Sequence, residues 1–197
     1  MKVGEIVAVA TTTFTAQSYE LNYAPAFGSL LRVPVPGANA RSPLYYALCY
    51  GSQSGAIEPG RHAVAWGRFD DDEDDIYRRQ PQLSQVLRTT FDALLVGYAS
   101  GDAVVQRVPA MPPRLHALVY EATCEEVALF NADLSYLRFV LRTPLPNADD
   151  FIAAAIDHAH RAMGGDHAFL VSAARSVARL LGAEHERVMN ILELLDA

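Results

Sequence analysis

The sequence predicts an α+β protein, in which a small N-terminal β-barrel precedes a C-terminal helical bundle. Two observations support this prediction. Residues 3–122 contain many short apolar runs that alternate along the chain and are separated by turn residues, which is typical of strands. From about residue 123 the apolar side chains recur at helical spacing instead. We therefore expect two regions, a barrel over 1–122 and a helical region over 123–197.

Eight runs in the first region are predicted strands, so the barrel should have about six strands or more. They are VGEIVAVA (3–10), TFTAQSYEL (13–21), SLLRVPV (29–35), PLYYALCYG (43–51), HAVAWGR (62–68), ALLVGYA (93–99), AVVQRVP (103–109) and LHALVYEA (115–122). In the fourth run Leu44, Tyr46, Leu48 and Tyr50 share one face, and Tyr45, Ala47 and Cys49 share the other. Both faces are apolar, which indicates a sheet that is covered on both sides.

One helix is expected within the barrel region, near residues 76–92. Its apolar positions Leu83, Val86, Leu87 and Phe91 follow helical spacing. Pro81 suits the first helical position, where the missing N–H would have no partner within the helix. The pair of runs at 93–99 and 103–109 is joined by Ser100-Gly101-Asp102, a compact hairpin signal.

The second region is predicted to consist of helices separated by glycine and proline breaks. Thr123 and Glu126 form a capping-box pattern, and Asn147 is a candidate N-cap. Four apolar stripes follow: Leu134, Leu137 and Leu141; Ile152, Ile156, Ala159 and Met163; Phe169, Leu170, Ala173, Val177 and Leu180; and Val188, Ile191, Leu192 and Leu195. Gly164-Gly165 and Gly182 are expected to end the second and third.

Composition narrows the class of function. The formal net charge of −7 falls to −1 without the six acidic residues at 70–75, so no overall field attracts nucleic acid. Lys2 is the only lysine, which excludes a catalytic lysine elsewhere. Cys49 and Cys124 lie far apart without a partner motif, which favours reduced thiols and a cytoplasmic location. The apolar N-terminal run is too short to span a membrane.

The acidic run comprises Asp70, Asp71, Asp72, Glu73, Asp74 and Asp75. Counted from Asp70, it fails the calcium-loop pattern, because position six is Asp75 rather than glycine and position twelve is Pro81 rather than glutamate. We interpret the run as a solvated interaction loop beside a helix N-terminus, where Asp74 and Asp75 are favourable. We expect no bound metal, and we expect replacement of the run by Asn and Ser to leave the fold intact.

Three further motifs fail at the position that the chemistry requires. GAIEPGRH (55–62) has Arg61 and His62 where a phosphate-binding loop needs Lys and Ser/Thr. GSQSG (51–55) has Gln53 where a nucleophile elbow needs serine. His158 and His160 are two residues apart on a predicted helix and point in different directions. We therefore expect no cofactor and no enzymatic activity.

The tail ARSVARLLGAEHERVMNILELL resembles a helix-turn-helix, with Gly182 at the turn. Arg187 and Asn190 would be the candidate DNA contacts on its second helix. Glu184, Glu186 and Glu193 share that surface and would repel phosphates, so ordinary packing of two helices is favoured.

A resemblance adds to this interpretation. VGEIVAVATTTFT, FGSLLRV, YALCYG, IYRRQPQL, LLVGYASGD and VPAMPPRLHALVYEATCEEVALF, in this order, resemble the HAS-barrel at the N-terminus of HerA-type DNA translocases, which is similar to the N-terminal barrel of ATP synthase catalytic subunits. In that family the barrel is a non-catalytic crown that contributes to ring assembly and to docking of a nuclease. This chain departs from the family because no ATPase domain or phosphate loop follows the barrel.

These observations lead to an expected function and an alternative. We expect an assembly or adaptor protein that binds another protein, with a ring ATPase or nuclease of DNA processing as the partner implied by the resemblance. Self-association through barrel rims or tail helices is a further expectation. The alternative is a DNA-binding regulator that uses the helix-turn-helix-like tail.

Overall fold

The computed structural model describes residues 1–35, 44–58, 60, 62–68, 72–101, 103–145 and 147–196. Seven antiparallel strands form one sheet. They are β1 (Lys2–Val9), β2 (Thr13–Ser18), β3 (Leu30–Pro34), β4 (Leu44–Ala56), β5 (Leu87–Ser100), β6 (Ala103–Val105) and β7 (Leu118–Glu121). The predicted strands at 3–10, 13–21, 29–35, 43–51, 93–99, 103–109 and 115–122 are confirmed, with shifted ends.

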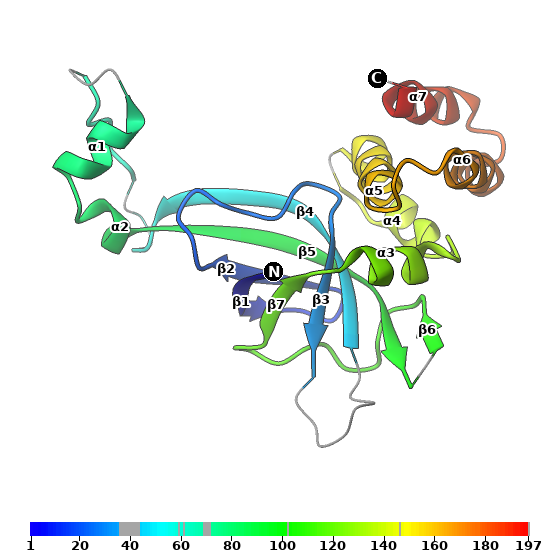
Figure 1. Ribbon diagram of the computed structural model, residues 1–197, viewed down its shortest axis with the longest axis horizontal. Helices are drawn as coiled ribbons and strands as arrows, with labels where there is room; N and C mark the ends of the chain where they lie inside the picture. The colour runs from blue at the N-terminus through cyan, green and yellow to red at the C-terminus, as the bar shows by residue number, and fades with distance from the viewer. Residues whose placement is uncertain are drawn as a thin grey trace.

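The sheet closes nearly into a ring. Its strand order is β2-β1-β7-β3-β4-β5-β6, and a further pairing between β2 and β5 joins the two ends of the six-stranded part. Strand β6 lies outside this ring, and among the described residues its pairing is with the end of β5, from Tyr98 to Ser100. The ring occupies the centre of the molecule, between a protruding β4–β5 hairpin and a group of helices (Figure 1).

Alternation along the strands gives each face its own hydrophobic cluster. On β4, Ala47 and Cys49 point into the ring and are buried with Ile6, Phe14 and Phe91. The opposite face of the same strand carries Tyr46 and Leu48, which pack against the helices. The prediction that both faces of this strand are covered is therefore confirmed, with the two sets of residues as expected.

The helical region contains α3 (Cys124–Asn131), α4 (Leu137–Arg142), α5 (Ala148–Ala162), α6 (His167–Leu181) and α7 (His185–Asp196). Helix α5 is central and contacts each of the other four (Figure 1). The capping box predicted for Thr123 and Glu126 is present. Asn147 occupies the N-cap of α5, although its side chain makes no capping hydrogen bond. The α+β class and the order of its two regions are confirmed.

Gly28 makes the closest approach between the loop before β3 and helix α5. Its φ is +83°, and a Cβ atom here would lie 2.5 Å from the backbone carbon of Ala154. Only glycine fits both conditions. Next to it, the rings of Phe27 and Phe151 lie 5.3 Å apart, and Phe151 is fully buried. The sheet and the helices thus share one continuous hydrophobic cluster.

The prediction of one inserted helix near residues 76–92 is wrong in its extent. Helix α1 (Glu73–Arg79) lies earlier, α2 (Leu83–Val86) has four residues, and strand β5 begins at Leu87. Leu87 and Phe91, expected in the helix, pair with Ala56 and Ser52 of β4. Over so short a segment, the spacing of the apolar residues fits a helix or a strand. Backbone pairing with the 13-residue strand β4 makes residues from Leu87 onward a strand. The strand expected at 62–68 is also wrong: residues 62–67 have no regular structure.

Two predictions in the helical region are corrected. The stripe of Leu134, Leu137 and Leu141 is not one helix with the segment before it, because α3 ends at Asn131 and α4 starts at Leu137. Buried Gln106 lies at this break: its amide donates to the carbonyls of Phe130 (2.5 Å) and Asp133 (2.6 Å). In the third stripe Leu180 is 39% exposed, and the adjacent Leu181 is buried instead.

Candidate interaction surface

One part of the chain projects from the ring, and we call it the arm: residues 51–58, 62–68 and 72–89. It consists of the outer ends of β4 and β5, helices α1 and α2, and the segment 62–68 that has no regular structure. The arm extends to the side of the ring opposite the helical region (Figure 1). It lacks a hydrophobic cluster of its own, since both buried clusters lie in the ring and in the helical region.

A chain of hydrogen bonds holds the arm to the ring. The side-chain amide of Asn22 donates to the Tyr77 hydroxyl of α1 at 2.6 Å. The backbone N–H of Asn22 donates to the Thr89 hydroxyl of β5 at 2.7 Å. Thr89 is buried, and its hydroxyl also lies 2.7 Å from that of Ser54 in β4. Asn22 has a φ of +62°, a conformation that asparagine tolerates better than most residues. These contacts fix α1 relative to the hairpin.

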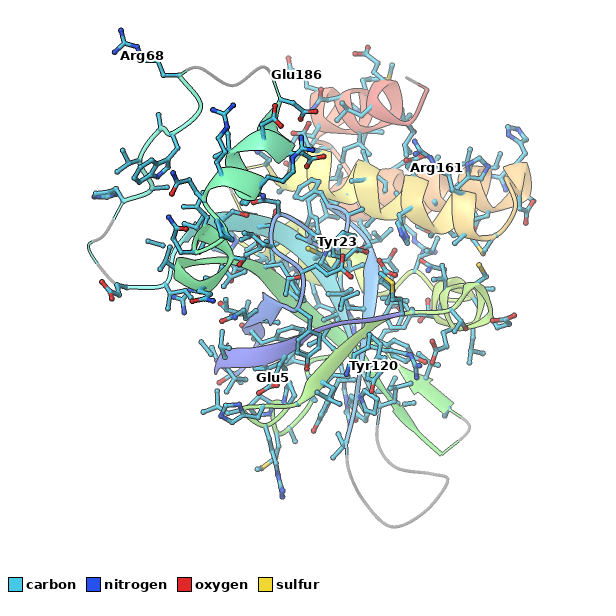
Figure 2. All side chains as sticks on the ribbon, turned by 60° about the vertical axis from the view of Figure 1, so that its left-hand side comes forward. Glu5, Tyr23, Arg68, Tyr120, Arg161 and Glu186 are labelled. Carbon is cyan, nitrogen blue, oxygen red and sulfur yellow. The ribbon has the colours of Figure 1, made fainter. Side chains whose placement is uncertain are left out.

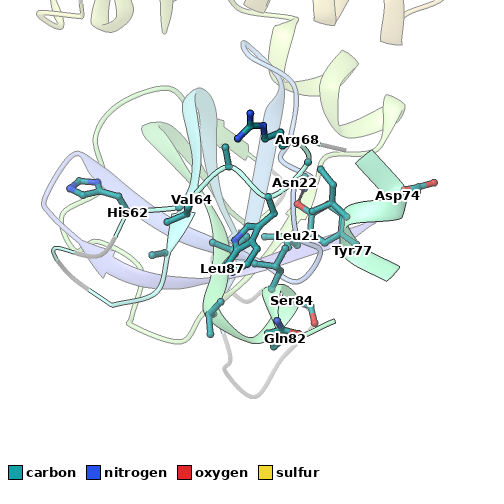
Figure 3. Close-up of a pocket in the computed structure, with 18 residues that line it drawn as sticks. Leu21, Asn22, His62, Val64, Arg68, Asp74, Tyr77, Gln82, Ser84 and Leu87 are labelled. Atoms are coloured by element: carbon teal, nitrogen blue, oxygen red, sulfur yellow. Dashed lines mark hydrogen bonds between the residues drawn. The ribbon is translucent and has the colours of Figure 1, made fainter. Parts of the chain in front are cut away.

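The arm contains a wide cleft of about 1430 Å³ between the segment 62–68 and helices α1 and α2 (Figure 3). Val64, Trp66, Ile76, Leu83 and Val86 supply much of its apolar surface. A Cβ atom on Gly67 would lie 2.6 Å from the Ile76 side chain, so the two walls touch there. This volume is larger than the roughly 300 to 1,000 Å³ that is typical of small-molecule pockets.

Apolar side chains in this cleft are unusually exposed. Val64 is 68% exposed, Trp66 53% and Val86 41%. Single exposed apolar residues are normal on protein surfaces, but here three of them lie together on one concave surface. Polar groups from Asn22, His62 and Gln82 lie around them (Figure 3). The cleft therefore has an apolar centre with polar groups at its edge.

The acidic run borders this cleft. Asp72 is the N-cap of α1, and its carboxylate accepts the N–H of Asp74 at 3.0 Å. Asp74 lines the cleft, and Asp75 forms an ion pair with Arg78 one turn later. The helix therefore starts within the run rather than after it. Asp70 and Asp71 lie outside the described residues, as does the side chain of Glu73.

In the described part of the chain, no group of three or more His, Cys, Asp or Glu side chains could hold a metal ion. Ser52, Gln53 and Ser54 of the elbow-like motif are consecutive residues of strand β4. In the described ranges, no helix is both long and apolar enough to cross a bilayer.

The two candidate DNA contacts lie on α7. Arg187 forms ion pairs with two carboxylates: its guanidinium lies 2.6 Å from Asp149 of α5 and 2.9 Å from Glu184. Both hydrogen bonds raise the pKa of the guanidinium above its ordinary value, and the bond to Asp149 has the larger effect. Asn190 is exposed on the same helix. The structure thus gives Arg187 a role in joining α7 to α5.

A second polar surface lies on the outside of β1, β7 and the adjacent loops, away from the arm. Figure 2 shows Glu5 and Tyr120 on the ring and Arg68 at the far end of the arm. Here the groups bind one another: the Glu5 carboxylate lies 2.5 Å from the His116 ring, and the Tyr23 hydroxyl donates to Glu121 at 3.0 Å. The named side chains of this surface thus pair with one another.

The acidic run is evident in the sequence, whereas the cleft beside it is not. The alternation at 62–68 predicts a strand with one buried face, but Val64 and Trp66 are exposed. The available signal was HAVAWG: it contains the only tryptophan of the chain and lies between proline-, glycine- and aspartate-rich segments. An apolar run bounded in this way fits an exposed binding segment as well as a strand.

The fold and the surface define a class: an α+β protein with a nearly closed antiparallel ring, a helical region and a protruding arm. Neither models of known protein families nor curated proteins gave a match to this chain.

Proposed function

We propose that this protein is a non-catalytic assembly or adaptor module that docks to another protein through the arm. One observation carries the proposal: Trp66, Val64 and Val86 are exposed on one concave surface that shares no residue with either hydrophobic cluster. Tryptophan is strongly enriched at the energetic centres of interfaces, and burying such side chains drives association.

The partner class comes from the resemblance to HAS-barrel crowns, which work within larger assemblies. We propose that the ring belongs to this group and that the partner is a ring translocase or nuclease of DNA processing. The ring-like sheet of six strands is consistent with this proposal. The alternative, a DNA-binding regulator, has less support because Arg187 is engaged by Asp149 and Glu184.

Trp66 offers a direct measurement because it is the only tryptophan in the chain. The purified protein is titrated with a HerA-type translocase and a nuclease from the same genome, each purified as a variant in which all tryptophans are replaced by phenylalanine. Docking through the cleft should shift the Trp66 emission to shorter wavelength, because the indole loses water. An emission spectrum unchanged by both partners contradicts the proposed partner class.

Co-expression then tests the surface with matched variants. Trp66→Ala should abolish co-purification, whereas Leu129→Ala should not, because Leu129 is 56% exposed on α3, away from the arm. The same complexes are assayed for ATP hydrolysis and DNA end cutting. ATP hydrolysis by the isolated protein would contradict the non-catalytic proposal, and equal co-purification of both variants would contradict docking through the cleft.

A further inference from the structure

Strand β4 has an open edge in the arm. Its first half pairs with β3 as far as Leu48, and Cys49 exchanges backbone hydrogen bonds with Gly28 and Ser29. From Gly51 to Ala56 the strand pairs with β5 on one side. Within the described ranges, no backbone group bonds to the other side of this segment. A strand edge of this kind is a template for pairing with another chain.

The hydrogen-bond register shows which groups face outward. The N–H of Ile57 donates to the carbonyl of Val86 at 2.9 Å, so Ile57 faces β5. Bonded and outward-facing residues alternate along an antiparallel pair. The backbone N–H and C=O of Ser52, Ser54 and Ala56 therefore point away from β5, toward the open edge.

This edge carries none of the features that normally protect strand edges. Natural proteins place lysine, other charges or proline there to prevent pairing. Residues 51–56 contain Gly, Ser, Gln and Ala, without a charge or a proline. Ser52, Gln53 and Ser54 are exposed, and a Cβ atom on Gly51 or Gly55 would meet no atom within 4 Å. Another strand that approaches this edge therefore meets no charge and no proline on residues 51–56.

We propose that the occupant of this edge is the same strand of a second copy of the chain, antiparallel about a two-fold axis through Ser54. In this register Ser54 pairs with the partner's Ser54, and Ser52 pairs with the partner's Ala56. Each pair exchanges two hydrogen bonds. The two arms then form a continuous sheet in the order β5, β4, β4 and β5.

A second copy fits this edge because the edge is self-complementary. It presents three outward-facing residues, so a two-fold axis through the middle one satisfies every group of both strands. Pairing of identical segments also brings Gln53 opposite the partner's Gly55, which leaves room for the longer side chain. Because the segment is uncharged, two copies meet without local repulsion although the whole chain carries −7.

Cysteine cross-linking tests the register directly. In a Cys124→Ser background, which removes the exposed native thiol, Ser54→Cys places two thiols on the axis with Cα atoms about 5.5 Å apart. Oxidation should give a covalent dimer. The control Ser52→Cys should not cross-link, because its copies are four residues out of register, about 14 Å apart. Equal cross-linking at both positions, or none at Ser54→Cys, overturns the proposal.

Sedimentation equilibrium gives the second readout. Ser54→Pro removes an outward N–H that β5 does not use, so the chain keeps its internal ladder while the dissociation constant of the dimer rises roughly 30-fold. Ser54→Ala keeps the N–H and should remain dimeric, and far-UV circular dichroism checks that both variants fold. A wild-type protein that is monomeric at 100 μM would overturn the proposed self-pairing. The open edge would then pair with a strand of a different protein. The tryptophan titration is independent of this result.

Discussion

Arg187 of α7 and Asp149 in the first turn of α5 join two helices that are 38 residues apart in sequence. The Arg187 Nη2 atom lies 2.6 Å from one carboxylate oxygen, and Nε lies 3.1 and 3.3 Å from the two oxygens. The arginine side chain is 35% exposed and the aspartate 19%. This contact, with buried Ile191 beside it, fixes α7 on the helical region.

Loss of this pair should lower stability modestly. We expect Arg187→Ala and Asp149→Asn each to reduce the free energy of unfolding by about 1 kcal/mol, because solvent screens a pair that is one-third exposed. Urea unfolding of both single variants and the double variant should show a non-additive loss. Arg161→Ala is the control, since its pair with Asp157 is 79% exposed on the arginine side. An equal loss in the control would contradict a special role for Arg187.

DNA binding should be weak. Fluorescence anisotropy with duplex and single-stranded DNA at physiological salt should show nothing tighter than about 10⁻⁴ to 10⁻⁶ M, because Arg187 is engaged and acidic residues surround it. The Arg187→Ala/Asn190→Ala double variant should behave like the wild type. Submicromolar binding that this variant loses would instead support the DNA-binding regulator.

Gln106 should be the most sensitive polar residue of the helical junction. Besides its bonds to two carbonyls, its side-chain oxygen accepts the N–H of Tyr136 at 2.9 Å. Gln106→Ala removes the side-chain partner of three backbone groups, two of which (Phe130 C=O and Tyr136 N–H) are buried. We expect it to lower the free energy of unfolding by about 3 kcal/mol. Urea unfolding measures the loss, with exposed Gln85→Ala as a control that should change it by less than about 0.5 kcal/mol. A small effect of Gln106→Ala would show that water replaces the amide.

His158 should make stability depend on pH. Burial of this α5 side chain lowers its pKa below the ordinary 6.5, outweighing the opposite effects of Glu121 and Asp157. The unfolded chain then binds the proton more readily than the folded one, so stability is full above pH 6.5 and falls as the pH drops below it. The loss due to this residue is at most about 1.4 kcal/mol per pH unit.

Urea unfolding between pH 7.5 and 5.5 checks this dependence. His158→Gln should flatten the profile relative to the wild type, whereas His160→Gln on the same helix should retain the slope. Parallel profiles for the wild type and His158→Gln would show that other groups cause the pH dependence.

The two thiols should react at very different rates. Burial raises the pKa of Cys49 to about 11, and its thiol donates to the Pro25 carbonyl inside the ring. Cys124 is exposed at the start of α3. At pH 8 a thiol reagent should therefore modify Cys124 quickly and Cys49 only after unfolding. Peptide mass spectrometry identifies the sites, and fast labelling of Cys49 in a Cys124→Ser variant would mean that the ring opens readily.

Local pattern was sufficient for the features whose cause is local. Alternation in 44–50 predicted both faces of β4, and the Thr123–Glu126 spacing predicted a capping box, because both depend on residues only a few positions apart. The glycine-bounded stripes likewise predicted α5 and α6.

Tertiary structure decided the remaining features. Leu87 and Phe91 fit a helix by spacing, but 12 residue pairs with β4 make them strand. The alternation around Val64 and Trp66 fits a strand. Among the described residues, however, no strand pairs with this segment, and both side chains are exposed in the cleft. The six acidic residues and Arg187 were visible in the sequence, whereas the contacts of Arg187 with Asp149 depend on how α7 crosses α5. Composition and periodicity therefore determined the class and the two regions, while pairing between distant segments decided the arm, its cleft and its open edge, because those energies depend on partners that local sequence does not specify.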